Sequence, residues 1–130
     1  MLAELLGHNN VSFVKLDSFK SSSDFALEGL ADKKLNVSDE TNRSYIDSPV
    51  YTEATSEGTI KLNKKHGGMY DYTVKANFII VGNFYPKFKD ATGMQRRVVV
   101  VPFNHKLKPE EKILNIERRI AEKELSAIFN

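Results

Sequence analysis

Two short apolar runs near the middle of the chain give the clearest prediction of its fold. Residues 78–81 read Phe-Ile-Ile-Val, and residues 98–101 are four consecutive valines. Both runs are mostly β-branched and are bounded by turn residues. This pattern is typical of strands that are buried on both faces of a parallel sheet.

Three further segments are predicted to be extended. Residues 11–16 and residues 33–40 read as strands, the second ending in two adjacent carboxylates. Residues 59–74 alternate apolar and polar side chains on both sides of a His-Gly-Gly sequence that begins at His66. We place a hairpin turn there, because glycine accepts positive φ angles without steric cost.

Helices are predicted between and after these strands. The leucines of residues 2–6 share one helical face, and Gly7 ends that helix. Residues 22–30 form a short helix with a serine cap, and residues 47–55 form another. From Pro109 onward an amphipathic helix packs against the rest of the chain. Strands that alternate with helices predict an α/β fold with an open, mainly parallel sheet.

Polar side chains stand at the ends of the predicted strands. Asp39 and Glu40 end one strand, and Asn83 follows the next. Arg96 and Arg97 come directly before the valine run. Ligands of open α/β sheets bind at strand ends, and the guanidinium fork matches phosphate oxygens. Alternatively, the amide caps a turn, and the carboxylates and guanidinium groups are simply solvated.

The composition indicates one globular domain. At 130 residues, with 41% hydrophobic and 28% charged residues, the chain can bury a core. It lacks the run of about eighteen apolar residues that a membrane span needs, so we expect no membrane association. Its first residues do not have the pattern of a signal peptide. The lack of cysteine excludes disulfides and thiolate zinc sites and is consistent with a cytoplasmic location.

The net charge of +2 is unevenly distributed. Residues 61–108 contain 10 Lys and Arg against 2 Asp and Glu, a balance of +8. Lys61, Lys64, Lys65 and His66 belong to the predicted hairpin and lie at or near its turn. A projecting basic hairpin suits contact with a phosphate backbone. Alternatively, its lysines protect an exposed strand edge from pairing with other chains.

The order of these features resembles the superfamily 3 helicases. A strand ending in Asp-Glu, a lysine-tipped hairpin, a strand followed by Asn83, and an Arg-Arg pair before a valine run occur in this order. The chain is most similar to the C-terminal ATPase domain of phage and plasmid primase-helicases of the poxvirus type. The likeness spans residues 2–129, and its most specific part is the Gly-Asn-Phe-Tyr-Pro-Lys-Phe-Lys-Asp run from Gly82.

The resemblance implies an AAA+-like P-loop NTPase core with a β-hairpin insertion. It implies that Asp39 lies near the Mg²⁺ of bound ATP and that Glu40 polarises the attacking water. Asn83 would sense the γ-phosphate. Either Arg96 or Arg97 would be the arginine finger that one subunit of a hexamer offers to the ATP of its neighbour. The basic hairpin tip would grip single-stranded DNA in the central channel.

One motif of the resembled family is absent. The sequence has no Gly-rich phosphate cradle ending in Gly-Lys-Ser or Gly-Lys-Thr. We therefore expect residues 1–130 to be a partial ATPase domain, truncated before or within the P-loop helix. By itself it would bind ATP and Mg²⁺ weakly and would hydrolyse ATP at a negligible rate. Residues 78–81 and 98–101 would also lack a shared neighbouring strand, so we expect self-association into a dimer or a larger assembly.

Two other functions are compatible with these features. The basic middle of the chain also suits a stand-alone, ATP-independent protein that binds single-stranded DNA or modulates a helicase. Alternatively, residues 98–101 and the final helix are packing surfaces of an assembly protein that is unrelated to helicases. The helicase hypothesis predicts that activity depends on nucleotide, whereas the stand-alone DNA-binding protein does not need it. Both of these bind DNA, whereas the assembly protein does not.

Overall fold

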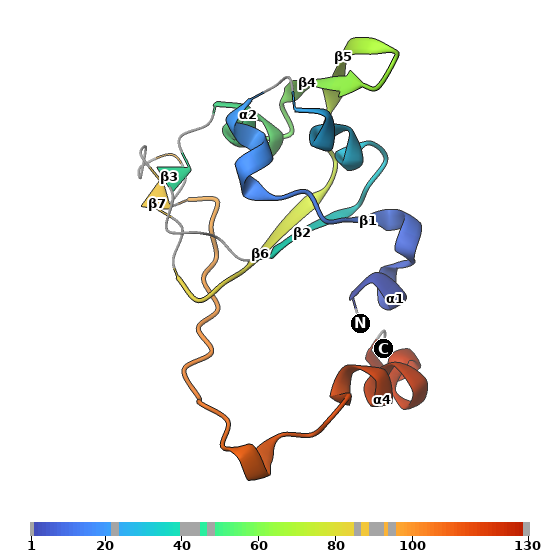
Figure 1. The fold of residues 1–130 in the computed structure, drawn as a ribbon, viewed down its shortest axis with the longest axis vertical. Coiled ribbons are helices and arrows are strands. Elements are labelled where there is room, and N and C mark those ends of the chain that lie inside the picture. The colour runs from blue at the N-terminus through green and yellow to red at the C-terminus, as the bar shows by residue number, and fades with distance from the viewer. Residues whose placement is uncertain are drawn as a thin grey trace.

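The computed structural model describes residues 2–21, 24–39, 45–46, 49–84, 87–88, 93 and 96–128. Their elements are shown in Figure 1. The helical elements are α1 (Leu2–Leu6), η1 (His8–Asn10), η2 (Leu16–Lys20), η3 (Phe25–Leu30), α2 (Pro49–Ala54), η4 (Pro109–Glu111), α4 (Ile116–Lys123) and α5 (Leu125–Ile128). The strands are β1 (Val11–Ser12), β2 (Leu35–Asp39), β3 (Tyr45–Ile46), β4 (Thr59–Lys64), β5 (Gly68–Thr73), β6 (Asn77–Val81) and β7 (Lys87–Phe88).

A parallel sheet in the order β1-β2-β6 forms the centre of the described chain. Val11 pairs with Leu35, and Asp39 pairs with Val81, so the three strands run in one direction. The hairpin β4–β5 and the short parallel pair β3–β7 form two separate sheets. The predicted α/β class is therefore confirmed, as are the strands at β2 and β6.

The predicted strand over residues 11–16 pairs only through Ser12, because a side chain replaces the backbone ladder beyond it. Asn36 is fully buried, and its Oδ1 accepts hydrogen bonds from Ser12 Oγ at 2.9 Å and Val14 N at 2.8 Å. Its Nδ2 donates to Val14 O at 3.0 Å. Ser38 Oγ accepts from Leu16 N at 3.2 Å. These side chains of β2 satisfy backbone groups that would otherwise be buried and unpaired.

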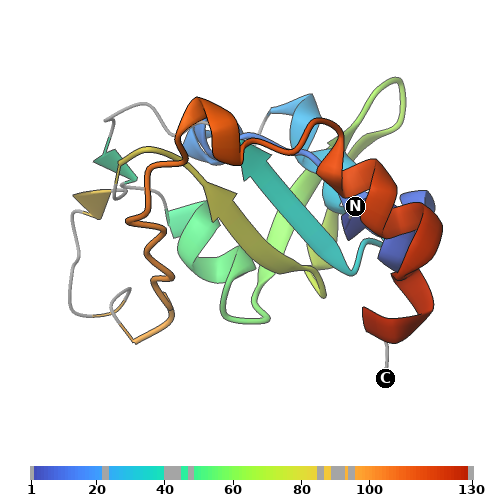
Figure 2. The same cartoon turned by 90° about the horizontal axis from the view of Figure 1, so that it is seen from below.

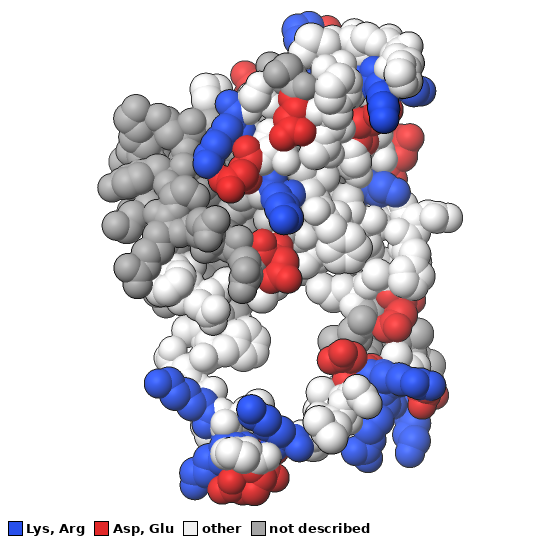
Figure 3. Space-filling model, viewed as in Figure 1, with Lys and Arg blue, Asp and Glu red and all other residues white. Residues whose placement is uncertain are grey.

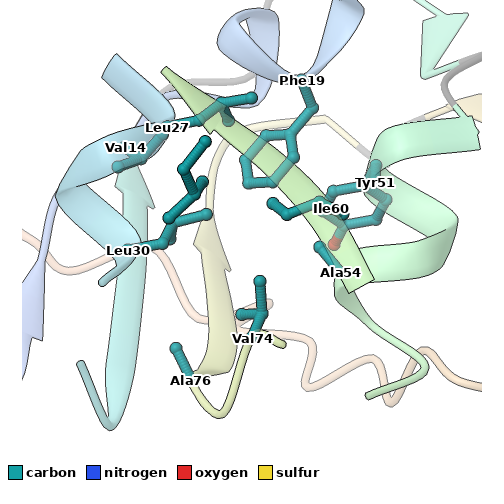
Figure 4. Close-up of a cluster of buried hydrophobic side chains, with 10 residues drawn as sticks. Val14, Phe19, Leu27, Leu30, Tyr51, Ala54, Ile60, Val74 and Ala76 are labelled. Atoms are coloured by element: carbon teal, nitrogen blue, oxygen red, sulfur yellow. The ribbon is translucent and has the colours of Figure 1, made fainter. Parts of the chain in front are cut away.

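The hydrophobic core lies on one face of the sheet (Figure 4). Three aromatic rings meet edge to face there. The centroid of Phe19 lies 5.2 Å from that of Tyr51 and 5.8 Å from that of Phe78. Each such pair contributes roughly 0.5–1.5 kcal/mol beyond its buried area. The other buried members come from η3, α2 and β4 and from the connections before η2 and after β5: Val14, Leu27, Leu30, Ala54, Ile60, Leu62, Val74 and Ala76.

The predicted hairpin is confirmed, and its turn involves the predicted residues. Lys64 pairs with Gly68, and Lys65, His66 and Gly67 form the turn. The positive φ angles are at His66, with 66°, and at Gly68, with 79°. Gly68 therefore adopts the positive φ angle that was predicted for a glycine in this turn. The other residue of the turn with a positive φ angle is His66, not a glycine.

Three predicted helices are present near their predicted positions. Residues 2–6 form α1, and Gly7 follows with a φ of 83°. Residues 49–54 form α2. The third, η3, is a 3₁₀ helix, and its cap is Asp24, whose Oδ1 accepts a hydrogen bond from Ala26 N at 2.8 Å. The predicted serine at position 22 lies outside the described residues.

The predicted strand over residues 98–101 is wrong in the described structure. Residues 98–103, which we call the arm, have no regular secondary structure, run as a drawn-out segment in Figure 1 and pair with no described strand. Val98 is partly buried against the core, whereas Val99 is 89% exposed and Phe103 92% exposed. Apolar β-branched residues favour extended backbone, but a strand also needs a neighbouring edge, and the described chain supplies none beside the arm.

The single helix predicted from Pro109 is also wrong, because it is interrupted. It is divided into η4, α4 and α5, and Asn115 takes a left-handed conformation with a φ of 54° between the first two. The apolar side chains of this part remain largely exposed, including Leu114 at 83%. Figure 1 shows η4 and α4 set away from the sheet, and in the view of Figure 2 they lie above and beside its strands.

Candidate functional site

The carboxyl ends of β2 and β6 meet at one edge of the parallel sheet. Asp39 is the last residue of β2 and pairs in register with Val81, the last residue of β6. Asn83 follows two residues later, and both Asp39 and Asn83 are exposed. A carboxylate and an amide therefore share the edge at which open α/β proteins bind ligands.

A groove of about 1120 Å³ opens beside this edge. One wall includes Phe78 and Ile80 of β6 together with Asn83. The other wall is the chain from Arg97 through Asn104. The structure therefore brings Asn83 and Arg97 to the same groove. Arg96 is exposed but does not line it.

Two further predictions for a nucleotide site concern Glu40 and a bound metal ion. Glu40 lies outside the described residues. Within the described ranges no three His, Cys, Asp or Glu side chains gather into a metal-binding group. Mg²⁺ that arrives on a nucleotide needs only one or two protein carboxylates, since phosphates and waters supply the other ligands. The exposed carboxylate of Asp39 at the strand end is compatible with that use.

Three of the predicted DNA-binding residues stand at the hairpin tip. Lys64, Lys65 and His66 are all exposed. In Figure 3 Lys and Arg side chains project around this end of the molecule. Lys61 lies further down β4, where its Nζ donates to Asp71 Oδ1 at 2.9 Å across the hairpin. Because this ion pair balances the charge of Lys61, the unbalanced positive charge is concentrated at the tip.

The base of the hairpin is held by the core and by hydrogen bonds between Tyr72 and Asp32. Ile60 and Leu62 are buried on one face of β4. The hydroxyl of Tyr72 accepts a hydrogen bond from Asp32 N at 2.7 Å, just beyond η3. Partial burial, with a smaller contribution from the charge of Glu28, raises the pKa of Tyr70 beside it. The tip therefore projects from an anchored base.

The hairpin and the polar edge lie at opposite ends of β6. The chain leaves β5 at Thr73 and enters β6 at Asn77, whereas Asn83 follows the other end of that strand. Figure 1 shows the β4–β5 hairpin and the last residues of β6 toward opposite ends of that strand. A five-residue strand spans about 17 Å. One short strand therefore connects the two groups of candidate residues.

A family model shows which family this chain resembles over most of its length. The model of DUF5906, a family of unknown function, matches residues 1–97. The chain belongs to the DUF5906 family. No curated protein matches the chain.

The DUF5906 match includes both groups of candidate residues. Asp39, the hairpin tip, Asn83, Arg96 and Arg97 all lie within residues 1–97. The arm and the C-terminal helices lie beyond the match. In the part of the chain that the structure describes, no helix is long and apolar enough to cross a membrane.

Two residues that the sequence pattern did not single out line the groove of this DUF5906 protein. Lys75 lies in the connection between the hairpin and β6 and is exposed. Tyr51 of α2 is 3% exposed, and burial raises its pKa to about 12. The charge balance of residues 61–108 already included Lys75, but nothing in the spacing of Tyr51 distinguishes it from a core residue.

Proposed function

We propose that the chain is part of an ATP-dependent DNA helicase of the superfamily 3 type, used in the replication of a phage, plasmid or other mobile element. The observation that carries this proposal is the position of Asp39 and Asn83 at the carboxyl edge of one parallel sheet, with Arg97 in the adjoining groove. The basic hairpin at the other end of β6 supplies the surface for single-stranded DNA.

On the nucleotide side, the proposal assigns a P-loop NTPase core to the intact parent protein. Asp39 would hold the Mg²⁺ of ATP, and Glu40 would orient the attacking water. Asn83 would contact the γ-phosphate, and Arg97 or Arg96 would act on the ATP of a neighbouring subunit. The metal and these side chains would stabilise the charge that develops on the transferred phosphoryl group. Residues 1–130 contain no phosphate cradle, so the parent must supply it from another segment.

On the DNA side, the tip residues Lys64 and Lys65 meet the electrostatic requirement for backbone binding. Exposed cations that contact phosphates release condensed counterions, which makes the affinity depend on salt and not on sequence. The ion pair between Lys61 and Asp71 predicts that Lys61 contributes less than the two tip lysines.

The test measures binding of a fluorescent oligo-dT to the 130-residue chain at several salt concentrations. We expect the double change Lys64→Ala and Lys65→Ala to reduce the slope of log K against log salt by about 1.4, since each phosphate contact on a single strand contributes about 0.7. The control changes Lys112→Ala and Lys123→Ala remove equal charge from exposed C-terminal positions and should change the slope less. Equal effects of both pairs would contradict a specific role for the hairpin tip.

ATP hydrolysis is tested in the longer parent that carries the cradle. Asn83→Ala and Arg97→Ala should each reduce DNA-stimulated hydrolysis by on the order of 10²-fold or more. Lys20→Ala, an exposed substitution on η2, should leave it unchanged. Full activity in both groove variants would remove the nucleotide part of the proposal.

The second candidate is an ATP-independent protein that binds single-stranded DNA. It is favoured by the exposed basic tip in a chain whose sequence has no phosphate cradle. The two candidates differ in nucleotide dependence. DNA affinity of the parent that changes on addition of a non-hydrolysable ATP analogue supports the helicase, and affinity that does not change supports the second candidate.

A further inference from the structure

β6 ends the described parallel sheet with an unpaired edge. It pairs with β2 on one side, and no described strand pairs with its other side. Ile79 and Val81 are 38% and 54% exposed on one face, whereas Phe78 and Ile80 pack against the core on the other. Edge strands are usually protected by charges, prolines or bulges. The sequence of β6, Asn-Phe-Ile-Ile-Val, contains no charge and no proline.

The arm has the properties of a strand without a partner. It runs as a drawn-out segment (Figure 1), and its exposure alternates as in β6. Val98 is partly buried against the core, followed by Val99 at 89%, Val100 at 52% and Val101 at 67%. The odd-numbered valines of the arm therefore correspond to Ile79 and Val81, the more exposed positions of β6. Two apolar strands with this same two-residue period are suited to lie in one sheet.

The groove between β6 and the arm has a volume comparable to that of one strand. A strand in a packed sheet occupies roughly 4.8 Å by 10 Å in cross-section and advances about 3.4 Å per residue. Five or six residues therefore fill roughly 800–1000 Å³. The groove measures about 1120 Å³ and has β6 on one side and the arm on the other.

We propose that this groove receives the arm of a second copy of the same chain, while the first copy's arm enters the groove of its partner. The result is a two-fold symmetric dimer in which the two arms lie side by side between the two β6 edges. Each copy's own arm would then be separated from its own β6 by one strand, which would occupy the groove. A reciprocal exchange also closes on itself and leaves no free edge at the junction.

The apolar area is sufficient for such a dimer. The side chains that would be covered in each copy are partly or largely exposed: Ile79, Val81, Phe84, Val99, Val100, Val101 and Phe103. At roughly 100 Å² each they supply about 700 Å² per copy. The total of roughly 1400 Å² lies within the usual range of stable interfaces, about 1200–2000 Å². The proposal needs neither DNA nor nucleotide. A preceding strand in a longer parent would compete for the groove, so the proposal concerns the 130-residue chain.

The oligomeric state is measured first, by light scattering during size-exclusion chromatography. We expect twice the chain mass of 14.7 kDa at a concentration of about 100 μM. The double change Val99→Lys and Val101→Lys should return the chain to the monomer mass. The control Ile113→Lys and Leu114→Lys places equal charge on other exposed apolar residues and should leave the dimer intact. A monomeric wild-type chain, or a dimer that survives the arm changes, would overturn the proposal.

Cross-linking then identifies which segments meet. Because the chain has no cysteine, single engineered thiols are unambiguous. An Ile79→Cys chain mixed with a Val99→Cys chain should form a disulfide-linked heterodimer on oxidation, since paired strands bring the Cα atoms into the range of about 4.4–6.8 Å. A Lys20→Cys chain mixed with the Val99→Cys chain is the control and should not cross-link comparably. An Ile79→Cys, Val99→Cys double variant that closes within one chain would show that the arm pairs with its own β6, which contradicts exchange.

Discussion

Asn36 shows how one polar residue in the core determines the length of a strand. Its amide makes hydrogen bonds to Ser12 and to both backbone groups of Val14, and all of these atoms are buried. In the sequence Asn36 interrupts the apolar pattern of β2, and periodicity alone gives it no role. In the fold, the side chain of Asn36 supplies hydrogen bonds to the backbone of Val14, where β1 no longer pairs with β2.

We predict that Asn36→Ala destabilises the protein by about 2–4 kcal/mol, because it leaves the N–H and C=O groups of Val14 buried without partners. Urea unfolding followed by circular dichroism measures the change. Asn104→Ala removes the same group from an exposed position and should stay within about 0.5 kcal/mol of the wild type. A similarly small effect at Asn36 would show that water replaces the lost hydrogen bonds.

Tyr51 predicts how stability depends on alkaline pH. Burial raises the pKa of its phenol from 10.0 to about 12. Above pH 10 the unfolded chain loses this proton while the folded chain retains it, so the free energy of unfolding falls as pH rises toward 12. The loss is at most about 2.7 kcal/mol. Denaturant unfolding at pH 9, 10 and 11 measures it, and Tyr51→Phe should give a shallower decline. Parallel declines in the two proteins would contradict the prediction.

At the scale of elements, the β4–β5 hairpin combines an anchored base with a conformationally costly tip. Buried leucine and isoleucine side chains hold β4, and the Tyr72–Asp32 hydrogen bond ties β5 to the end of η3. At the tip His66 has a φ of 66°, a region that favours glycine. A histidine in such a position suggests that its side chain is retained for a reason other than stability.

We predict that His66→Gly leaves the stability unchanged or raises it by up to about 1 kcal/mol, because glycine adopts the left-handed conformation without strain. The same change should weaken binding to single-stranded DNA if the imidazole contacts it. Thermal unfolding and fluorescence anisotropy on one preparation separate the two effects. A gain in stability with undiminished DNA affinity would show that His66 serves only the turn.

The hydroxyl of Tyr72 allows the anchoring of the hairpin to be tested separately. Tyr72→Phe removes the bond to Asp32 N and should cost about 0.5–1.5 kcal/mol. Hydrogen exchange of the Asp32 amide should become faster, whereas amides of the β2–β6 ladder should change little. If the Asp32 amide exchanges at the wild-type rate in this variant, the hairpin is held by its apolar face alone.

For the molecule as a whole, the structure separates a packed body from an exposed C-terminal part. The buried apolar residues lie between Val11 and Ala76. Beyond the arm, residues 104–119 are all exposed, and Figure 3 shows open space between the C-terminal segment and the body. The stability of the body is therefore largely independent of η4, α4 and α5.

We predict that a chain ending at residue 103 keeps the free energy of unfolding within about 1 kcal/mol of the full chain, since few apolar groups are uncovered by the deletion. Circular dichroism during urea unfolding measures this. Deletion from residue 98 is the comparison, because it also removes Val98 from the core, and should cost more. A large loss from the shorter deletion would show that the C-terminal helices pack on the body in solution.

The local pattern of the sequence was sufficient to predict the strands β2 and β6, the hairpin and the first helices. These elements depend on side chains that are near neighbours in sequence: β-branched runs, alternation around Gly67 and Gly68, and a glycine after α1. The shared position of Asp39 and Asn83 also follows from sequence, once two consecutive strands are taken as parallel. Strand direction alone then places both residues at one edge.

Whether the valine run, residues 98–101, forms a strand depends on tertiary structure. Residues 98–101 have the composition of a buried strand, but a strand forms only where another edge offers its N–H and C=O groups. Composition cannot show whether that edge is present. In the same way, the ion pair of Lys61, the ladder completed by Asn36 and the groove shared by Asn83 and Arg97 depend on contacts between residues that are distant in sequence. Local preferences decide the elements, whereas long-range pairing decides which of them find partners.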